Sequence, residues 1–262
     1  MSASPLLDAI LRPGALDVSF EPVFDFRRGQ QPRLHAFECV VHGPAGTNGR
    51  NPDVLFDYAR RKREESRVER ACLAAALGEA RRLPAGTPLC LRLHPSVLEE
   101  DPEFLVFLGD TAEACGIAPE SLTVALLSRA GGCGESGLPD AVDALRSIGV
   151  GIAVAGIGAG ACGFPLLLAT RPDYLWIDPC LVRGCHADFY RQAVLEALAH
   201  LARKFGARIV AAGVEDAADL DGLSVVGIHL AQGNVLARRA LRHPMGPLQP
   251  YLVCGRASAV AR

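Results

Sequence analysis

Three glycines in the second half of the chain have the spacing of a phosphate-binding loop. The stretch GIGAGACG, residues 156–163, reads G-x-G-x-x-G from Gly158 and follows the apolar run VGIAVA. In dinucleotide-binding domains such glycines let the backbone approach a pyrophosphate, and an acidic residue about 20 positions further on binds the ribose. Asp178 lies at that spacing. The pattern therefore raises the hypothesis of a nucleotide-binding loop.

Other features of the same stretch argue against a nucleotide-binding loop. It lies past the midpoint of the chain, whereas the fingerprint normally opens a dinucleotide-binding half. The helix expected after it is short, because Arg171 and Pro172 end it. The chain contains 27 glycines, which makes accidental matches frequent. The fingerprint by itself does not define a nucleotide site.

Short β-like runs and helical patterns alternate along the chain. We expect eight strands, at residues 18–26, 34–41, 88–94, 121–127, 150–155, 173–178, 208–213 and 227–233. Helical periodicity predicts helices at residues 66–83, 102–115, 138–148, 163–170, 187–205 and 216–226. Strands that alternate with helices favour a parallel sheet with both faces covered, and eight such units favour one barrel over two domains.

The first two strands and the chain ends depart from this alternation. The connection RRGQQPR is too short for a helical crossover, so the first two strands should form an antiparallel hairpin. Ser4 and Pro5 have the types of an N-cap and first helical turn, which predicts a short N-terminal helix. Residues after Pro244 should be loosely structured. We expect one domain over residues 1–262, with the barrel at about 18–244.

Composition and charge disfavour several classes of partner. Lys+Arg 27 against Asp+Glu 29 gives a net charge of -2, so we expect no nucleic-acid partner and no membrane association. The start of the chain lacks the pattern of a secretory signal, which predicts a cytoplasmic protein. The nine cysteines form no C-x-x-C pair and should be reduced. Cys180, Cys185 and His186 lack a second pair of ligands, so we expect no metal there.

Segments along the chain resemble, in order, the motifs of the EAL-domain family of bacterial cyclic di-GMP phosphodiesterases. FEPVFDFRRGQ resembles the family's opening QPIxDLxxG, HAFECVV its GxEALxR, and LCLRLHPSVL its SVNLSPxxL. SLTVALLSRA resembles LxLEITES, and GVGIAVAGIGAG resembles LGVxIALDDFGTG. RPDYLWIDPCLV resembles PVDYLKIDxSFV, IVAAGVED resembles VVAEGVET, and IHLAQGNVLARRAL resembles the closing stretch with QG. The resemblance implies an α/β fold, an EAL-type (β/α)8 TIM-like barrel with an antiparallel first strand.

The resemblance also implies that most of the catalytic set is missing. Family enzymes use clustered carboxylates to hold two divalent cations, for which Mg²⁺ or Mn²⁺ is suited. This chain keeps the motif glutamate as Glu38, the acid of KID as Asp178, the second glutamate of EGVE as Glu215, and the late glutamine as Gln232. Positions at which the family's ligand, lysine or candidate base is replaced are Arg92, Ala125, Ala155, Gly156, Trp176 and Ala212.

These replacements predict a mouth without metal or catalysis. One remaining carboxylate does not hold a pair of divalent cations, so we expect no metal cofactor and no enzymatic activity. Mg²⁺ or Mn²⁺ is expected only if this interpretation is wrong. Arg92 stands where a metal ligand would lie, and we expect it to pair with Glu38. Asp178 and Glu215 are then expected to accept backbone hydrogen bonds.

Binding of cyclic di-GMP without turnover is a separate question. The family's phosphate-binding arginine falls on His42 and its opening glutamine on Glu21, and both changes weaken the attraction for an anionic ligand. Arg92 could compensate in part. Trp176 could stack on a ligand, and Gln232 could form a hydrogen bond to it. Alternatively, both are structural: Trp176 fills the barrel rim and Gln232 caps a loop.

The sequence therefore favours a catalytically inactive EAL-like domain that acts as a regulatory, protein-interaction module in bacterial signalling. The surface near residues 52–83, or the face that bears the tail, would contact the partner. The alternative is a cyclic di-GMP receptor that binds without metal and does not hydrolyse its ligand. A third possibility is an active phosphodiesterase.

Overall fold

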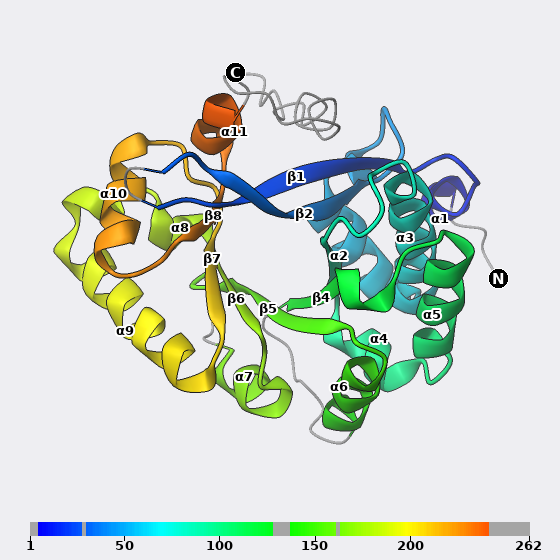
Figure 1. Ribbon diagram of the computed structural model, residues 1–262. Coiled ribbons are helices and arrows are strands. Elements are labelled where there is room, and N and C mark those ends of the chain that lie inside the picture. Colours follow the sequence, from blue (N-terminus) through cyan, green and yellow to red (C-terminus); the bar gives the residue numbers. More distant parts are fainter. Residues whose placement is uncertain (1–4, 28–29, 128–136, 161–162, 241–262) are drawn as a thin grey trace.

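A closed barrel of eight strands forms the centre of the computed structural model, which describes residues 5–27, 30–127, 137–160 and 163–240. Helices surround the barrel (Figure 1). Each strand pairs with its sequence neighbour, and β1 also pairs with β8 to close the ring. The strands are β1 Asp17–Asp25, β2 Arg33–His42, β3 Leu89–Leu93, β4 Leu122–Leu127, β5 Gly151–Ile157, β6 Tyr174–Ile177, β7 Arg208–Ala211 and β8 Leu230–Gln232.

The first strand is antiparallel to both of its neighbours, while the other strands run parallel. This confirms the expected hairpin and the barrel with an antiparallel first strand. All eight expected strands are present, with bounds that differ by a few residues. The widest difference is the last strand, expected at 227–233, because only Leu230–Gln232 pairs with β1 and β7.

The six expected helices are also present, with α1 at the N-terminus as predicted. Four further helices lie outside the predicted ranges, α2, α4, α8 and α11, and the last three each follow a strand closely. Ser4 and the segment after Pro244 lie outside the described residues. The helices are α1 Pro5–Ile10, α2 Pro52–Lys62, α3 Glu65–Ala80, α4 Pro95–Glu100, α5 Phe104–Ala114, α6 Leu138–Ser147, α7 Phe164–Thr170, α8 Pro179–Val182, α9 Phe189–Phe205, α10 Ala217–Val225 and α11 Asn234–Ala240.

Alternate side chains of each strand point to opposite sides of the barrel wall, which produces two separate apolar clusters. The outer cluster packs the strands against the surrounding helices. The inner cluster consists mostly of small residues around one large ring, Trp176. Its buried members are Val23, Ala36, Cys90, Ala125, Ala153, Ala155, Trp176, Val210, Ala212 and Leu230. The interior of the barrel is therefore filled by side chains.

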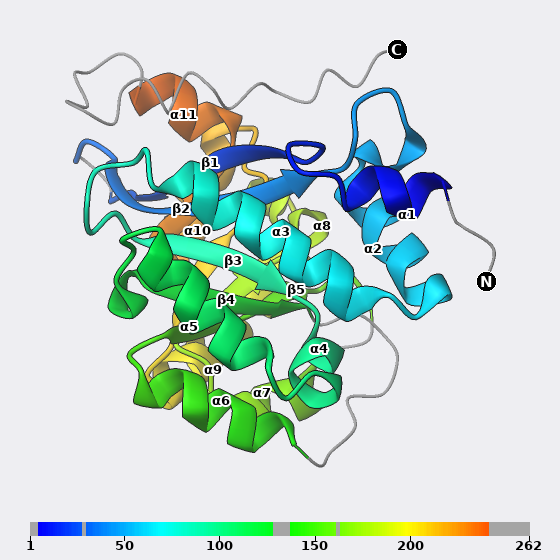
Figure 2. The same cartoon turned by 90° about the vertical axis from the view of Figure 1, so that its right-hand side faces the viewer.

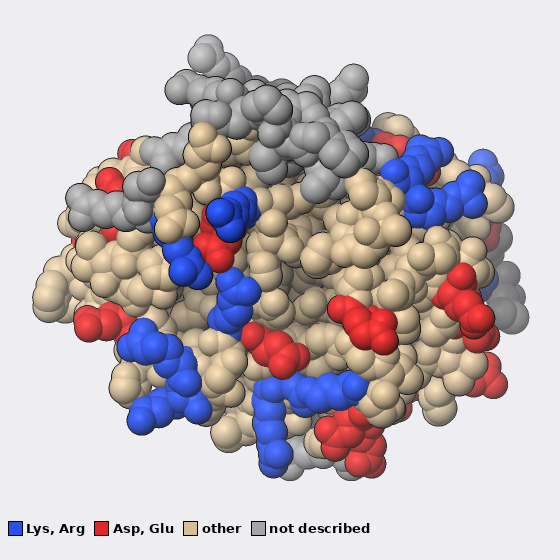
Figure 3. All heavy atoms as spheres, in the orientation of Figure 1, with Lys and Arg blue, Asp and Glu red and all other residues tan. Residues whose placement is uncertain are grey.

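Charges of both signs alternate over the face of the molecule in Figure 3. Arginine, lysine, aspartate and glutamate side chains lie among one another there, as expected from the net charge of -2. No helix in the described part of the chain has the length and apolar character required to cross a membrane.

One acidic residue of α3 faces the core. Glu69 is 3% exposed, and its Oε1 accepts a hydrogen bond from the backbone N–H of His94 at 3.0 Å. Burial raises the pKa of Glu69 from its ordinary 4.5 to about 8; the His94 bond lowers it, and nearby Glu65 raises it further. The carboxyl group therefore holds its proton at neutral pH.

Replacing Glu69 should change how stability depends on pH. Between about pH 4.5 and 8 the folded protein keeps a proton that the unfolded chain loses, so the free energy of unfolding falls as pH rises. Glu69→Gln has no such proton to keep, so its free energy of unfolding should not fall in this way. The difference in the free energy of unfolding, variant minus wild type, should therefore increase by at least about 1 kcal/mol from pH 5 to pH 8. Urea denaturation at several pH values tests this. Glu79→Gln, on the same helix, is the control and should not reproduce the trend.

A second prediction concerns the turn after β8. Gly233 has φ +152°, and a Cβ there would lie 2.1 Å from the backbone oxygen of Val214. Gly233→Ala should lower the free energy of unfolding by about 2 kcal/mol or more. Gly78→Ala, within α3 and with open space around the added methyl group, should raise it by roughly 0.5–1 kcal/mol. Equal effects of the two variants in thermal denaturation would contradict this account.

Candidate functional site

Two glutamates face each other at the mouth of the barrel, where the carboxyl ends of the parallel strands meet. Glu21 of β1 and Glu38 of β2 are directly opposite in the antiparallel register, and Glu38 is fully buried. Like charges in this position repel. Burial, followed by the charge of Glu38, raises the pKa of Glu21, while Arg92 lowers it. The pair needs donors and positive charge from the neighbouring strands.

Arg92 of β3 supplies the positive charge. Its Nε donates a hydrogen bond to Glu38 Oε1, as predicted from the sequence. The carboxylate in turn raises the pKa of Arg92 above its ordinary value. The side chain of Arg92 remains 42% exposed, so part of the guanidinium group faces the open mouth. Arg92 thus neutralises a buried acid and still presents donors to solvent.

Gln232 of β8 bonds to the second oxygen of the same carboxylate. Its Nε2 lies 2.6 Å from Glu38 Oε2 and 3.5 Å from Glu21 Oε2. Trp176 Nε1 donates to Gln232 Oε1 at 3.1 Å, which fixes the orientation of the amide. We call Glu21, Glu38, Arg92, Trp176 and Gln232 the mouth network. Both oxygens of Glu38 are therefore bonded to protein donors.

The mouth network corrects two alternatives considered for Trp176 and Gln232. Trp176 is 3% exposed and belongs to the apolar cluster inside the barrel, so its ring is packed by the protein. Gln232 is 4% exposed and bonds to side chains of other strands, so it does not cap a loop. Neither offers an exposed face for stacking or bonding to a ligand. Both residues instead support the buried carboxylate.

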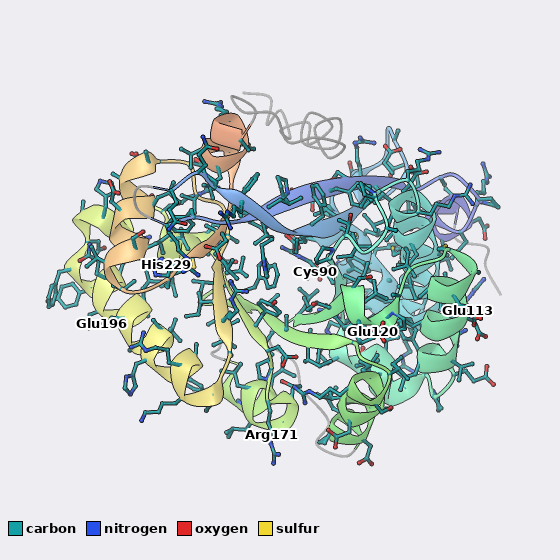
Figure 4. All side chains as sticks on the ribbon, in the orientation of Figure 1. Cys90, Glu113, Glu120, Arg171, Glu196 and His229 are labelled. Carbon is teal, nitrogen blue, oxygen red and sulfur yellow. The ribbon has the colours of Figure 1, made fainter. Side chains whose placement is uncertain are left out.

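Small residues occupy the neighbouring inward positions of the barrel wall. Ala125, Ala155 and Ala212 are buried beside Trp176, and none carries an ionisable group. Gly156 lies where the register of β5 and β6 shifts, with φ +81°. Figure 4 shows the side chains that project from the strands. The sequence reasoning placed all four positions among the lost ligands, and the structure supplies no carboxylate at any of them.

Three other residues singled out from the sequence lie around the mouth. Asp178 caps α8 by accepting from the backbone N–H of Cys180 at 2.9 Å, as expected. Glu215 was expected to accept backbone bonds, but among the described residues it pairs with Arg183 at 2.7 Å. Both side chains of this ion pair are exposed, so the pair contributes little to the free energy of unfolding.

His42 is the third of these residues. Its Nε2 lies 3.0 Å from Ser19 Oγ, and burial lowers its pKa, with Arg50 adding to the effect. The ring is therefore neutral at pH 7. The sequence reasoning missed Ser19, although its alternation with Glu21 along β1 places both side chains on the same face of the strand.

The glycine fingerprint has a structural explanation. Gly158 has φ +102°, and a Cβ on it would lie 2.4 Å from Leu181 Cδ1, so glycine permits α8 to pack closely there. Cys180 of the same helix donates to the carbonyl of Gly158. Residues 161–162 of the fingerprint lie outside the described part. Gly158 thus serves the contact between the end of β5 and α8, whereas a Cβ on Gly160 would meet nothing within 4 Å.

The described residues do not fit a pair of divalent cations. Hard cations require several oxygen ligands in one cluster. Within residues 5–27, 30–127, 137–160 and 163–240, no group of three or more His, Cys, Asp or Glu side chains converges to hold a metal. At the mouth, Glu38 already uses both oxygens, and a guanidinium group lies beside it. Mg²⁺ or Mn²⁺ has no suitable donor set there.

The match to a known family covers most of the chain. The EAL domain family matches residues 4–239. The chain belongs to the EAL domain family. Its closed barrel with antiparallel β1 agrees with solved EAL structures. The barrel mouth of this EAL domain is therefore the place to compare with its relatives.

Individual relatives carry different descriptions. BluF of Escherichia coli (strain K12), a blue light- and temperature-regulated antirepressor, is 25% identical over 85% of this chain and 54% of BluF. The cyclic di-GMP phosphodiesterase PdeB of Shewanella oneidensis is 30% identical over 36% of this chain and 11% of PdeB. BlrP1 of Klebsiella pneumoniae, solved with calcium and cyclic di-GMP, has a TM-score of 0.74 at 25% identity over 89% of this chain and 56% of BlrP1. This chain spans about half the length of BluF and BlrP1.

The ion pair of the mouth network should have a measurable energy. Arg92→Met leaves the buried Glu38 carboxylate without its counter-ion and should lower the free energy of unfolding by about 2–4 kcal/mol. Adding Glu38→Gln removes the buried charge and should recover part of the loss, which gives a favourable coupling in the double-mutant cycle. Urea denaturation followed by circular dichroism and by the fluorescence of Trp176, the single tryptophan, measures both.

A surface ion pair provides the control for this cycle. Arg67→Met removes the partner of Glu64 at 3.0 Å, where the arginine side chain is 62% exposed. This change should cost less than about 1 kcal/mol. A loss for Arg92→Met no larger than that of Arg67→Met would show that Glu38 does not depend on Arg92.

Proposed function

We propose that this EAL domain has no phosphodiesterase activity and acts as a regulatory module that binds a protein partner. The mouth network carries the proposal, because Glu38 is the one motif ligand that the described mouth retains and Arg92 and Gln232 occupy both of its oxygens. Two-metal hydrolysis needs several carboxylates around an activated water. A bound guanidinium group replaces the positive charge that the metals would bring.

The positions carried over from the family motifs support loss of catalysis. Arg92 replaces an asparagine ligand and Trp176 replaces the lysine near the phosphate. Alanine or glycine stands at four positions where the family has carboxylates: Ala125, Ala155, Gly156 and Ala212. The side chain of Trp176 fills the space inside the barrel beside three of them. Reversing one substitution would therefore not rebuild a metal site.

A protein partner is supported by the description of BluF. BluF is described as an antirepressor, a role that acts on another protein, and it aligns with 85% of this chain. Because the described residues supply no catalytic donor set, we place the function on the outer surface. We place this activity in the cytoplasm, where the free thiols of the described chain stay reduced.

A second candidate function is a cyclic di-GMP receptor that works without metal. It is favoured by the exposed edge of Arg92 and by BlrP1, whose solved complexes contain cyclic di-GMP. Against it stand the neutral His42 in place of an arginine and the acidic Glu21 in place of a glutamine. A phosphate that contacted Arg92 would also lie near the buried carboxylate of Glu38.

Hydrolysis and binding assays test the proposal. With Mg²⁺ or Mn²⁺ and cyclic di-GMP, we expect no linear dinucleotide above a blank without protein, because no described donor set holds two cations. An active EAL phosphodiesterase in the same buffer is the positive control. Calorimetry with Mn²⁺ alone should show no binding at the mouth. Metal-dependent product formation by the wild type would overturn the proposed inactivity.

Calorimetry with cyclic di-GMP in the presence of a chelator separates the two candidates. The interaction proposal predicts no micromolar binding. Micromolar binding that is lost in Arg92→Met and kept in Arg67→Met would establish the receptor function instead. Affinity purification of the tagged chain from its own organism should then return one protein reproducibly, and failure to return any would contradict the interaction role.

A further inference from the structure

A cavity of about 150 Å³ lies between the barrel wall and the helices that cover it, and Arg92 of the mouth network is among its lining residues. Helices α3 and α5 lie over β3 and β4 in Figure 2, with α2 to one side. Outward-facing side chains of β2 and β3 form one wall of the cavity, and α2, α3 and α5 form the other. Its apolar lining includes Phe56, Leu73, Ala76, Leu91, Phe104 and Leu108.

The size of this cavity points to a single ring. Protein interiors are close-packed and contain few voids larger than a water molecule. An apolar cavity of about 150 Å³ in another protein stays dry and binds benzene. The cavity between α3 and β3 has a similar volume, 150 Å³, and a comparable lining of leucine and phenylalanine. It therefore has room for a six-membered ring.

Four polar residues line the cavity, Asn51, Asp53, Glu69 and Arg92; Arg92 is already paired with Glu38, and the buried Glu69 gives the cavity its chemical preference. Glu69 lines it and is 3% exposed, with Oε1 held by the backbone of His94. Because burial raises the pKa of Glu69 to about 8, its carboxyl group can donate a proton to an acceptor at neutral pH. The exposed Asn51 and Asp53, at the start of α2, lie where the lining reaches the surface. The carboxylate of Asp53 disfavours an anionic ligand at this opening.

We propose that the cavity binds a neutral six-membered-ring compound with one hydroxyl or amide group. The ring lies against Leu73, Leu91 and Phe104, and the polar group bonds to Glu69. A charged ligand would lose its hydration in this apolar site, which costs far more than burial of a neutral hydroxyl.

The location of the cavity connects it to the mouth network through two strands. β2 lines the cavity with Cys39, the residue after Glu38, and β3 lines it with Leu91 and Arg92, of which Arg92 bonds to Glu38. A ligand in the cavity therefore packs against the outer face of the strand segments that hold the ion pair. This places a small-molecule site next to the residues that distinguish this barrel mouth.

Phenol is a suitable probe because it combines one ring with one hydroxyl group. Calorimetry and ligand-observed NMR should show saturable binding of phenol to the wild-type chain. Benzoate and benzylammonium, which have the same ring and opposite charges, should each bind at least tenfold more weakly. Absence of saturable phenol binding at millimolar concentration would overturn the proposal, and tighter binding of either ion would overturn its preference for a neutral ligand.

Substitutions in α3 locate the binding site. Ala76 is 2% exposed and lines the cavity, so Ala76→Phe should fill it and abolish phenol binding. Ala76→Leu, a smaller change, should weaken binding at least tenfold and serves if the phenylalanine variant fails to fold. Ala74→Phe adds the same ring on the exposed side of the helix and should leave binding unchanged. Equal binding by the folded Ala76 variants and the wild type would place the phenol elsewhere and overturn the proposal.

Discussion

The repulsion between Glu21 and Glu38 determines how the mouth of this barrel is arranged. The two residues are directly opposite in the β1–β2 register, and Glu38 is fully buried. A buried carboxylate without partners is strongly unfavourable. Arg92 provides a counter-charge and Gln232 provides an amide donor, each from a different strand. Trp176 then holds the amide in place. One unfavourable pair thus accounts for the polar contacts of four neighbouring strands and for the position of the large ring inside the barrel.

Part of this site could be predicted from the sequence. The resemblance to the EAL family places Glu38 and Arg92 at positions of metal ligands, so a guanidinium–carboxylate pair was expected in place of the metal, and it is present. The bonds from Gln232 to Glu38 and from Trp176 to Gln232 were not predicted. They depend on how β8 meets β1 when the barrel closes, and local sequence carries no information on that register. The same holds for the cavity, which depends on how α2, α3 and α5 pack on the wall.

The fold was predicted more completely than the site. Hydrophobic patterns identified all eight strands and the helices that follow most of them, because these elements bury one face and expose the other. Helices α4 and α8 were missed because each is too short to show a helical period. Their signals were local: His94 before Pro95, and Asp178 before Pro179, combine a capping side chain with proline at the first helical position. Glu69 was not singled out from the sequence, because its burial depends on how α3 packs against the barrel.

Closure of the barrel by its first strand has a consequence for synthesis of the chain. Glu21 and Gln232 bond across 211 residues of sequence. The hairpin of β1 and β2 leaves the ribosome long before β8 exists, so its two glutamates meet at first without the amide donor that later joins them. Contacts so distant in sequence form late and slow the folding of a domain. The polar centre of the mouth is thus completed only when nearly the whole barrel has been made.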